Sequence, residues 1–242
     1  MTLEELKECY GEEYPAAVVI DEKRMPLVKE RRFSRSYYSP EHKYGTRISL
    51  FMDKSAAITI TAAELQREWH QWNADERSDF CSACKWLSEQ EDFLEMMRFI
   101  MEHGGPSDWS VIALSVAGKL PQGEAFDLLV RALRSVEPGE GANIGQAIAS
   151  TKDVRAEKAL RDQVERLWRD EGMWVDADFM NWVAYEAMTS ILHLIELGAR
   201  KDDFEGKVRQ LVEHPCKGVR QSCKRLSKYF PELGMERVSP AS

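Results

Sequence analysis

The sequence predicts a mainly α-helical protein that begins with a small, mostly antiparallel β-sheet. Apolar residues recur at helical spacing in successive segments from residue 61 onwards, and glycine or proline separates many of these segments. Between residues 46 and 60, by contrast, apolar and polar residues alternate. We therefore expect a small β-rich region over residues 1–60, a helical-repeat domain over residues 61–234 and a flexible tail over residues 235–242.

The β-rich region is predicted from residues 15–60, and its clearest element is a hairpin over residues 46–60. Alternating residues flank Asp53-Lys54-Ser55, a turn-like tripeptide. The helical domain should begin directly afterwards, because Thr61 and Glu64 have the spacing of a capping box.

Helical periodicity then continues along the chain in segments of ordinary helix length. The first seven predicted helices cover residues 64–72, 75–88, 92–103, 109–117, 124–136, 143–150 and 154–170. Ser107 is expected to cap the fourth, which is apolar on almost every side and is predicted to be buried all round. Three further apolar stripes cover residues 179–194, 204–212 and 219–230. None of these helices can bury its stripe alone, so they must pack on one another.

The helices contain an internal repeat. Val111, Ile144, Val183 and Val219 each lie near the start of a predicted helix, with spacings of 33, 39 and 36 residues. Periods of roughly 30–47 residues with two helices per unit are typical of helical solenoids.

Two segments of the repeat region also share a short sequence pattern. Residues 153–160 and 219–226 both contain Val-Arg followed by a small residue and Leu. This wording resembles the V-R-x-x-A-x-x-x-L phrase of HEAT-type repeats, and the resemblance covers about residues 107–230. It implies a HEAT-like α-solenoid that binds a partner on its concave face. The alternative is an irregular helical array in which the phrase recurs by chance.

The composition narrows the range of partners. The chain has 33 Lys and Arg against 41 Asp and Glu, a formal net charge of −8. This acidic balance argues against general affinity for nucleic acid or anionic membranes, and it favours a protein partner with basic groups. No run approaches the roughly 18 apolar residues of a membrane span. Five scattered cysteines indicate reduced thiols, so we expect a cytoplasmic protein.

The sequence contains few candidates for chemistry. Cys81 and Cys84 form a C-x-x-C pair, which has the spacing for redox chemistry or half a zinc site. The pair lies inside a predicted helix, and small buried cysteines explain it equally well. We expect no metal, no cofactor and no catalytic residue, and a redox or metal role for this pair stays open.

The most informative surface candidate is the segment from residue 168 to residue 182, which holds three tryptophans and four carboxylates. Trp168 and Trp182 fall on core stripes, and Asp176 or Asp178 is placed to cap the next helix. Only Trp174 lacks a structural assignment. Tryptophan is enriched in interaction hot spots, and loop carboxylates can meet a basic partner. The predicted partner-binding residues are Trp174, Asp170, Glu171, Asp176 and Asp178.

Two functions follow from these observations. The favoured one is a non-enzymatic protein-binding module: a HEAT-like scaffold, an adaptor, or an inhibitor of the immunity type. The alternative is a nucleic-acid-acting enzyme, because HEAT-like folds include DNA glycosylases that use Trp and Asp on a concave basic face. This chain has the Trp and Asp but lacks a basic array between residues 137 and 198. The sequence favours a binding protein over an enzyme but does not decide between them.

Overall fold

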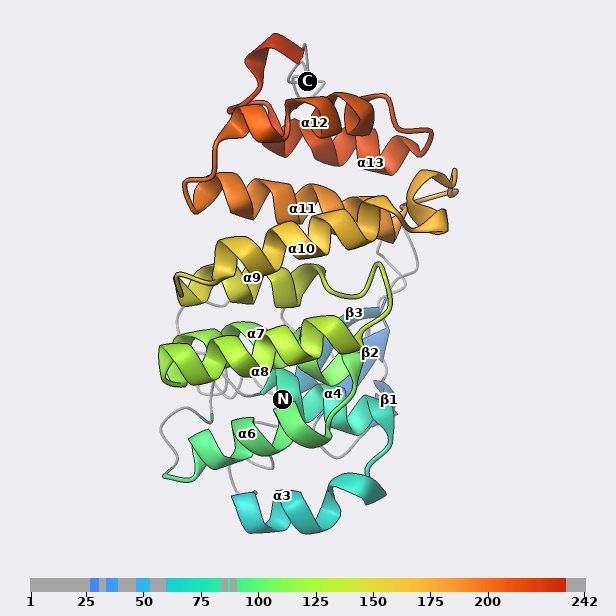
Figure 1. Ribbon diagram of the computed structural model, residues 1–242. Coiled ribbons are helices and arrows are strands. Elements are labelled where there is room, and N and C mark those ends of the chain that lie inside the picture. The colour runs from blue at the N-terminus through green and yellow to red at the C-terminus, as the bar shows by residue number, and fades with distance from the viewer. Residues whose placement is uncertain are drawn as a thin grey trace. The chain divides into compact units, whose positions relative to one another are not determined.

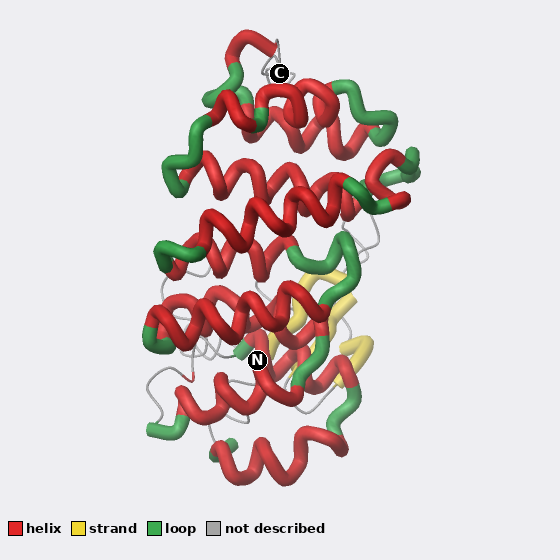
Figure 2. Tube along the Cα trace, in the orientation of Figure 1, coloured by secondary structure: helices red, strands yellow, loops and turns green. Residues whose placement is uncertain are grey.

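A computed structural model describes most of the helical part of the chain and three short strands (Figure 1). The described residues are 27–30, 34–38, 47–52, 60–83, 87 and 91–233. They are mainly helical, as predicted, and helices dominate the trace in Figure 2. None of the described helices combines the length and apolarity needed to cross a membrane. The contacts divide the chain into two compact units, residues 1–96 and 97–242.

The first unit contains a three-stranded antiparallel sheet in the order β1-β2-β3. Its strands are β1 (Leu27–Glu30), β2 (Ser34–Tyr38) and β3 (Arg47–Met52). β3 pairs with β2, with Ser34 opposite Met52. The sequence predicted a hairpin over residues 46–60, of which residues 46 and 53–59 lie outside the described residues.

The helices of the first unit are α3 (Ala62–Glu68), the 3₁₀ turn η1 (Trp69–Gln71), α4 (Ala74–Ser82) and the start of α6 (Phe93–His103). The predicted capping box is confirmed: Thr61 Oγ1 accepts from the Glu64 amide at 3.2 Å, and the Glu64 carboxylate accepts from the Thr61 amide at 3.0 Å. Cys81 lies in α4 and is buried, whereas Cys84 lies outside the described residues. The predicted C-x-x-C pair is therefore not placed as a unit.

The second unit is a succession of helices joined by short connections. Its α-helices are α7 (Pro106–Lys119), α8 (Gln122–Ser135), α9 (Ala142–Thr151), α10 (Ala156–Trp168), α11 (Trp182–Glu196), α12 (Glu205–Val212) and α13 (Lys217–Ser222). Its 3₁₀ turns are η2 (Glu171–Trp174), η3 (Lys201–Asp203), η4 (Cys223–Leu226) and η5 (Pro231–Leu233).

These helices pack in chain order, from green to red in Figure 1. α9 packs against α7, α8, α10 and α11, and α11 also packs against α12 and α13. The four repeat residues, Val111, Ile144, Val183 and Val219, lie on α7, α9, α11 and α13, which are alternate helices of this succession. The two Val-Arg phrases are not equivalent, however. Val154 is 95% exposed in the α9–α10 turn, whereas Val219 is buried within α13.

The apolar stripes meet in a continuous core. Fully buried residues recur at helical spacing on each helix: Ile112 and Val116, Leu129 and Leu133, Ile144 and Ile148, Leu160 and Val164, Ile191 and Leu194, Val208 and Leu211. Two expectations for α7 are wrong. Val111 and Leu114 are exposed, so part of the surface of α7 faces solvent. Its N-cap is Gly105 and not Ser107, because Pro106 takes the first helical position, which suits a residue without an N–H.

The α8–α9 loop approaches α11 closely through its glycines. Gly139 has a φ of +100°, a left-handed conformation that favours glycine. A side chain on Gly141 would place its Cβ 2.6 Å from Leu133 Cδ1 and still closer to Glu186 Oε1. The loop can therefore reach the buried Glu186 only because residue 141 has no side chain.

We predict that Gly141→Ala lowers the free energy of unfolding by about 1–3 kcal/mol, the usual cost of overpacking a filled site. Gly145→Ala in the following helix, α9, is the matched control, because its Cβ would make an ordinary contact 3.5 Å from Leu160 Cδ2. It should be neutral or stabilising by up to about 1 kcal/mol. Urea unfolding of the full chain measures both, and equal effects would show that the close approach is not tight.

Candidate functional site

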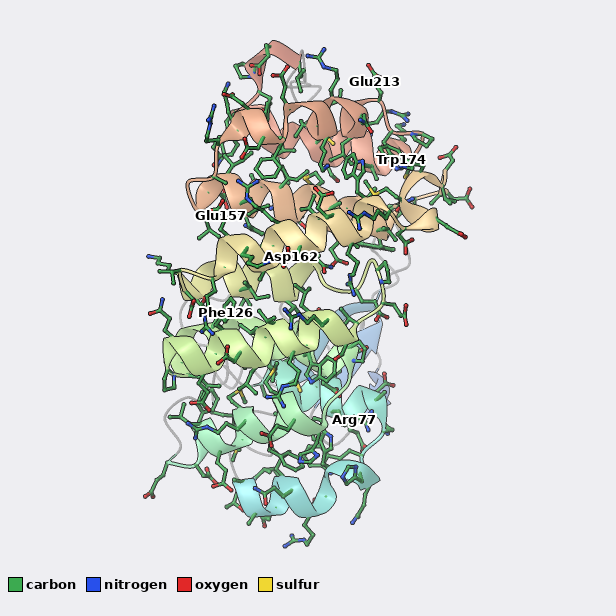
Figure 3. All side chains as sticks on the ribbon, in the orientation of Figure 1. Arg77, Phe126, Glu157, Asp162, Trp174 and Glu213 are labelled. Carbon is green, nitrogen blue, oxygen red and sulfur yellow. The ribbon has the colours of Figure 1, made fainter. Side chains whose placement is uncertain are left out.

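The candidate site is the α10–α11 connection, residues 169–181, together with the first turn of α11. The connection contains η2, and Figure 3 shows Trp174 beyond the C-terminal end of α10, whereas Glu157 lies near the start of that helix. All five predicted partner-binding residues lie in this connection. Asp170 is the N-cap of η2 and Trp174 its last residue, and Glu171, Asp176 and Asp178 are exposed.

The connection is held by Asn181, which is 6% exposed. Asn181 Oδ1 accepts from the Ala184 amide at 3.0 Å and so caps α11, while its Nδ2 donates to the carbonyl oxygens of Gly172 and Val175, each at 2.8 Å. The expectation that Asp176 or Asp178 caps α11 is therefore wrong. An asparagine serves better here, because it accepts from the helix and donates to the loop at once.

A second anchor comes from the α12–α13 connection. His214 is fully buried, and its Nε2 donates to the Met173 carbonyl oxygen at 2.7 Å. Its Nδ1 accepts from the Cys216 amide at 3.0 Å, so the hydrogen-bond partners assign the proton to Nε2. His214 also stacks on Trp174, with ring centroids 5.4 Å apart, and Trp168 meets the same indole edge-on at 5.4 Å. Trp174 is thus fixed between two rings while remaining 39% exposed.

Large apolar side chains are exposed along this anchored segment, and we call them the loop cluster. They are Trp174, Val175, Phe179 and Trp182, with exposed fractions of 39%, 54%, 79% and 56%. The prediction that Phe179 and Trp182 face the core is wrong, because α11 begins only at Trp182. Phe179 precedes the helix, and Trp182, as the first residue of α11, is exposed to solvent.

Three carboxylates, which we call the acidic rim, accompany the loop cluster: Glu171, Asp176 and Asp178. No described residue forms an ion pair with any of them. The exposed carboxylates of α10 behave differently. Glu157 pairs with Arg161 at 2.9 Å, Asp162 with Lys158 at 2.9 Å, and Glu165 with Lys207 at 3.2 Å. The carboxylates of the acidic rim therefore have no cationic partner among the described residues, whereas these carboxylates of α10 do.

Trp182 also borders a pocket of about 380 Å³. The first turns of α7, α9 and α11 surround it, and Gly139 and Glu140 of the α8–α9 loop complete its wall. Trp182 meets Tyr185, which also lines the pocket, edge-on with ring centroids 5.7 Å apart. The loop cluster and the pocket thus share one tryptophan.

The buried Glu186 fixes the wall of this pocket. Its carboxylate accepts from the amides of Gly139 at 2.8 Å and Gly141 at 2.9 Å, and from the side-chain amide of Gln163 on α10. Burial raises the pKa of Glu186, although these donors and the charge of Arg166 oppose the shift. One carboxylate thereby joins α10, α11 and the α8–α9 loop.

Sequence patterns did not reveal several of these groups. His214 contacts Met173 across 41 residues, and Glu186 contacts Gly141 across 45. The available signal for Glu186 was its place within the most apolar helical stripe, where a carboxylate needs buried partners. Within the described ranges, no cluster of three or more His, Cys, Asp or Glu side chains is arranged to hold a metal ion.

We predict that Asn181→Ala destabilises the connection by about 2–3 kcal/mol, because it removes a helix cap and leaves buried carbonyl groups without their donor. Hydrogen exchange of amides 171–184 and urea unfolding measure the effect. Asn143→Ala is the control, since its exposed side chain makes one hydrogen bond to Ser110 Oγ and should cost about 0.5 kcal/mol or less. Similar exchange rates in both variants would contradict the anchoring role of Asn181.

We also predict a pH dependence with a defined sign for Glu186. Burial raises its pKa above the ordinary value of 4.5, so the folded state binds this proton more tightly than the unfolded state. The stability of the protein relative to Glu186→Gln should therefore be highest below about pH 4.5 and fall as pH rises through the raised pKa. Urea unfolding across this range measures the difference.

Glu124 provides the control of opposite sign. Its hydrogen bonds from Arg98 lower its pKa, so its contribution relative to Glu124→Gln should be present at neutral pH and lost as pH falls. If the stability of the protein relative to Glu186→Gln also falls as pH falls, the pKa of Glu186 is not raised by its burial and the prediction is wrong.

No protein-family model, curated protein or solved structure matches the chain. The function of the site must therefore be argued from its own side chains. These side chains form an anchored connection that exposes apolar and acidic groups, a pocket beside it, and a buried carboxylate that fixes the pocket wall.

Proposed function

We propose that the chain is a non-enzymatic protein-binding module on a HEAT-like α-solenoid, and that the loop cluster and the acidic rim bind a protein partner with apolar and basic groups. The observation that carries this proposal is the exposure of four large apolar side chains within nine residues that are anchored by buried and part-buried hydrogen bonds. Contiguous exposed apolar surface with a polar rim is typical of interaction sites.

The energetics favour a covered state of this surface. Burying one large apolar side chain is worth about 1.5–3 kcal/mol relative to leaving it exposed. Collapse of the loop onto the protein would bury these groups, but Asn181 and His214 hold the backbone on its outer course. A partner can therefore gain this free energy at low entropic cost, since the surface is already ordered.

The charges favour a basic partner. The acidic rim forms no ion pair with the described residues. A cationic surface could therefore pair with these carboxylates without first displacing a Lys or Arg of this chain. Complementary charge mainly raises the rate of association and selects among partners. The net charge of −8 acts in the same direction.

The packing order supports the solenoid part of the proposal. α7, α9 and α11 contact each other in turn, and each is followed by a second helix that packs against it. Such arrays bury their cores between neighbouring units. Because the loop cluster lies in a connection between helices, the proposed contact surface is an edge of the array.

The nucleic-acid alternative gains no support from the two arginines at the start of α10, its N-cap Arg155 and Arg161. Arg155 lies 2.8 Å from both Asp127 and Asp153, and Arg161 lies 2.9 Å from both Glu157 and Asp203. Binding to nucleic acid requires Lys and Arg side chains that can contact phosphates and displace the counterions condensed on them. These cations are already paired with carboxylates, so we do not propose that activity.

The proposal is tested with a photoreactive benzophenone amino acid at Phe179, followed by irradiation in the native cell extract. The matched control carries the same group at Val154, which is equally apolar and 95% exposed but lies at the opposite end of α10. We expect a discrete protein adduct from position 179 that is absent from position 154. Identical adducts at both positions, or none at 179, would overturn the proposal.

With the captured partner in hand, Val175→Ser and Phe179→Ser together should weaken binding at least about tenfold, which corresponds to 1.4 kcal/mol. Their melting temperature should stay within about 2 °C of the parent, because both side chains are exposed. Calorimetric titration measures the affinity. Unchanged affinity in a folded double variant would remove the loop cluster from the interface.

A further inference from the structure

We infer that the pocket beside Trp182 receives the guanidinium group of an arginine from the bound partner. This inference rests on the proposed function and names the chemistry that its site recognises. The pocket is about 380 Å³ in volume and open to solvent, and it shares Trp182 with the loop cluster. A segment lying on the loop cluster can therefore place one side chain into it.

The charge of the lining selects a cation. Glu140 is the one charged residue among those that line the pocket, and it is exposed. Its carboxylate accepts from the Glu137 amide at 3.3 Å, which holds it on the loop at the pocket wall. A guanidinium group entering here meets this carboxylate, and the cation of Arg225, outside the lining, is engaged by the Tyr185 hydroxyl, to which its Nη1 donates at 3.2 Å.

Three helix N-termini surround the pocket, and alone they would favour an anion. Two of them are already offset by carboxylates of the protein. Asp108, 3% exposed, accepts from the Gly105 amide at 2.9 Å at the start of α7. Glu186 accepts from the amides of Gly139 and Gly141 at the start of α9. The positive ends of α7 and α9 are thus countered before any ligand arrives.

The remaining groups suit a guanidinium better than an ammonium. Trp182 is 56% exposed, so its ring can take part in stacking and cation–π contacts, in which arginine is favoured. Asn143 also lines the pocket, and its Nδ2 donates to Ser110 Oγ at 2.9 Å, which leaves Asn143 Oδ1 to accept from a ligand. The planar guanidinium has five N–H donors and can reach a carboxylate and an amide oxygen together.

The test uses the full chain and a matched pair of small probes. N-acetyl-arginine amide is titrated while the indole N–H signal of Trp182, assigned with Trp182→Phe, is followed by NMR. N-acetyl-citrulline amide has the same shape without the charge. We expect a saturable shift with the arginine probe, and affinity for the citrulline probe that is lower by about tenfold.

Two variants locate the interaction. Glu140→Gln should weaken binding of the arginine probe by about fivefold, because it removes the one charge in the lining. Glu157→Gln on α10 should leave it unchanged, because that exposed carboxylate lies far from the pocket and is paired with Arg161. Equal shifts from both probes, or no effect of Glu140→Gln, would overturn the inference.

Inorganic phosphate is the third probe, and saturable binding of phosphate at Trp182 would show an anion site and overturn the inference. The outcome is separable from that of the proposed function. If Phe179 captures a partner but the arginine probe does not bind, the pocket inference fails alone. If the arginine probe binds and Phe179 captures nothing, the proposed function fails instead.

Discussion

The carboxylate of Glu186 is the constraint on which this part of the molecule depends. A buried carboxylate must have its charge met by hydrogen-bond donors, and here the donors come from the α8–α9 loop and from Gln163 on α10. Satisfying this one group brings a loop and two helices to a fixed distance. The same contact places Gly139 against the start of α11, so the pocket wall and Trp182 take their positions from it.

The loop cluster follows from a second set of buried polar contacts. Asn181 and His214 satisfy backbone carbonyl groups of the α10–α11 connection, which would otherwise need water or collapse. Because these anchors act on the backbone, the side chains of the connection are left to face outward. An ordered backbone with exposed apolar groups and unpaired carboxylates is the arrangement that a protein partner can bind with little loss of entropy.

Local periodicity was sufficient to predict a mainly helical protein, and the Thr61 capping box was predicted from the spacing of Thr61 and Glu64. It failed where a boundary moved by one turn: α11 begins at Trp182, so Phe179 and Trp182 lie outside the core stripe to which their spacing assigned them. It could not find the contacts of Glu186 and His214, whose partners lie more than 40 residues away. The Val-Arg pattern could not show that its two copies occupy different settings, with Val154 exposed in a turn and Val219 buried in a helix.

The central claim is that an anchored, apolar and acidic connection is the surface that meets a partner. Hydrogen exchange of the full chain, with and without the partner captured at Phe179, tests it most directly. The account predicts slower exchange on binding at amides 171–182 and at the pocket wall, residues 139–143, with no change in the α9–α10 turn at residues 152–155. Protection confined to α8 and α10, with the connection unchanged, would contradict it.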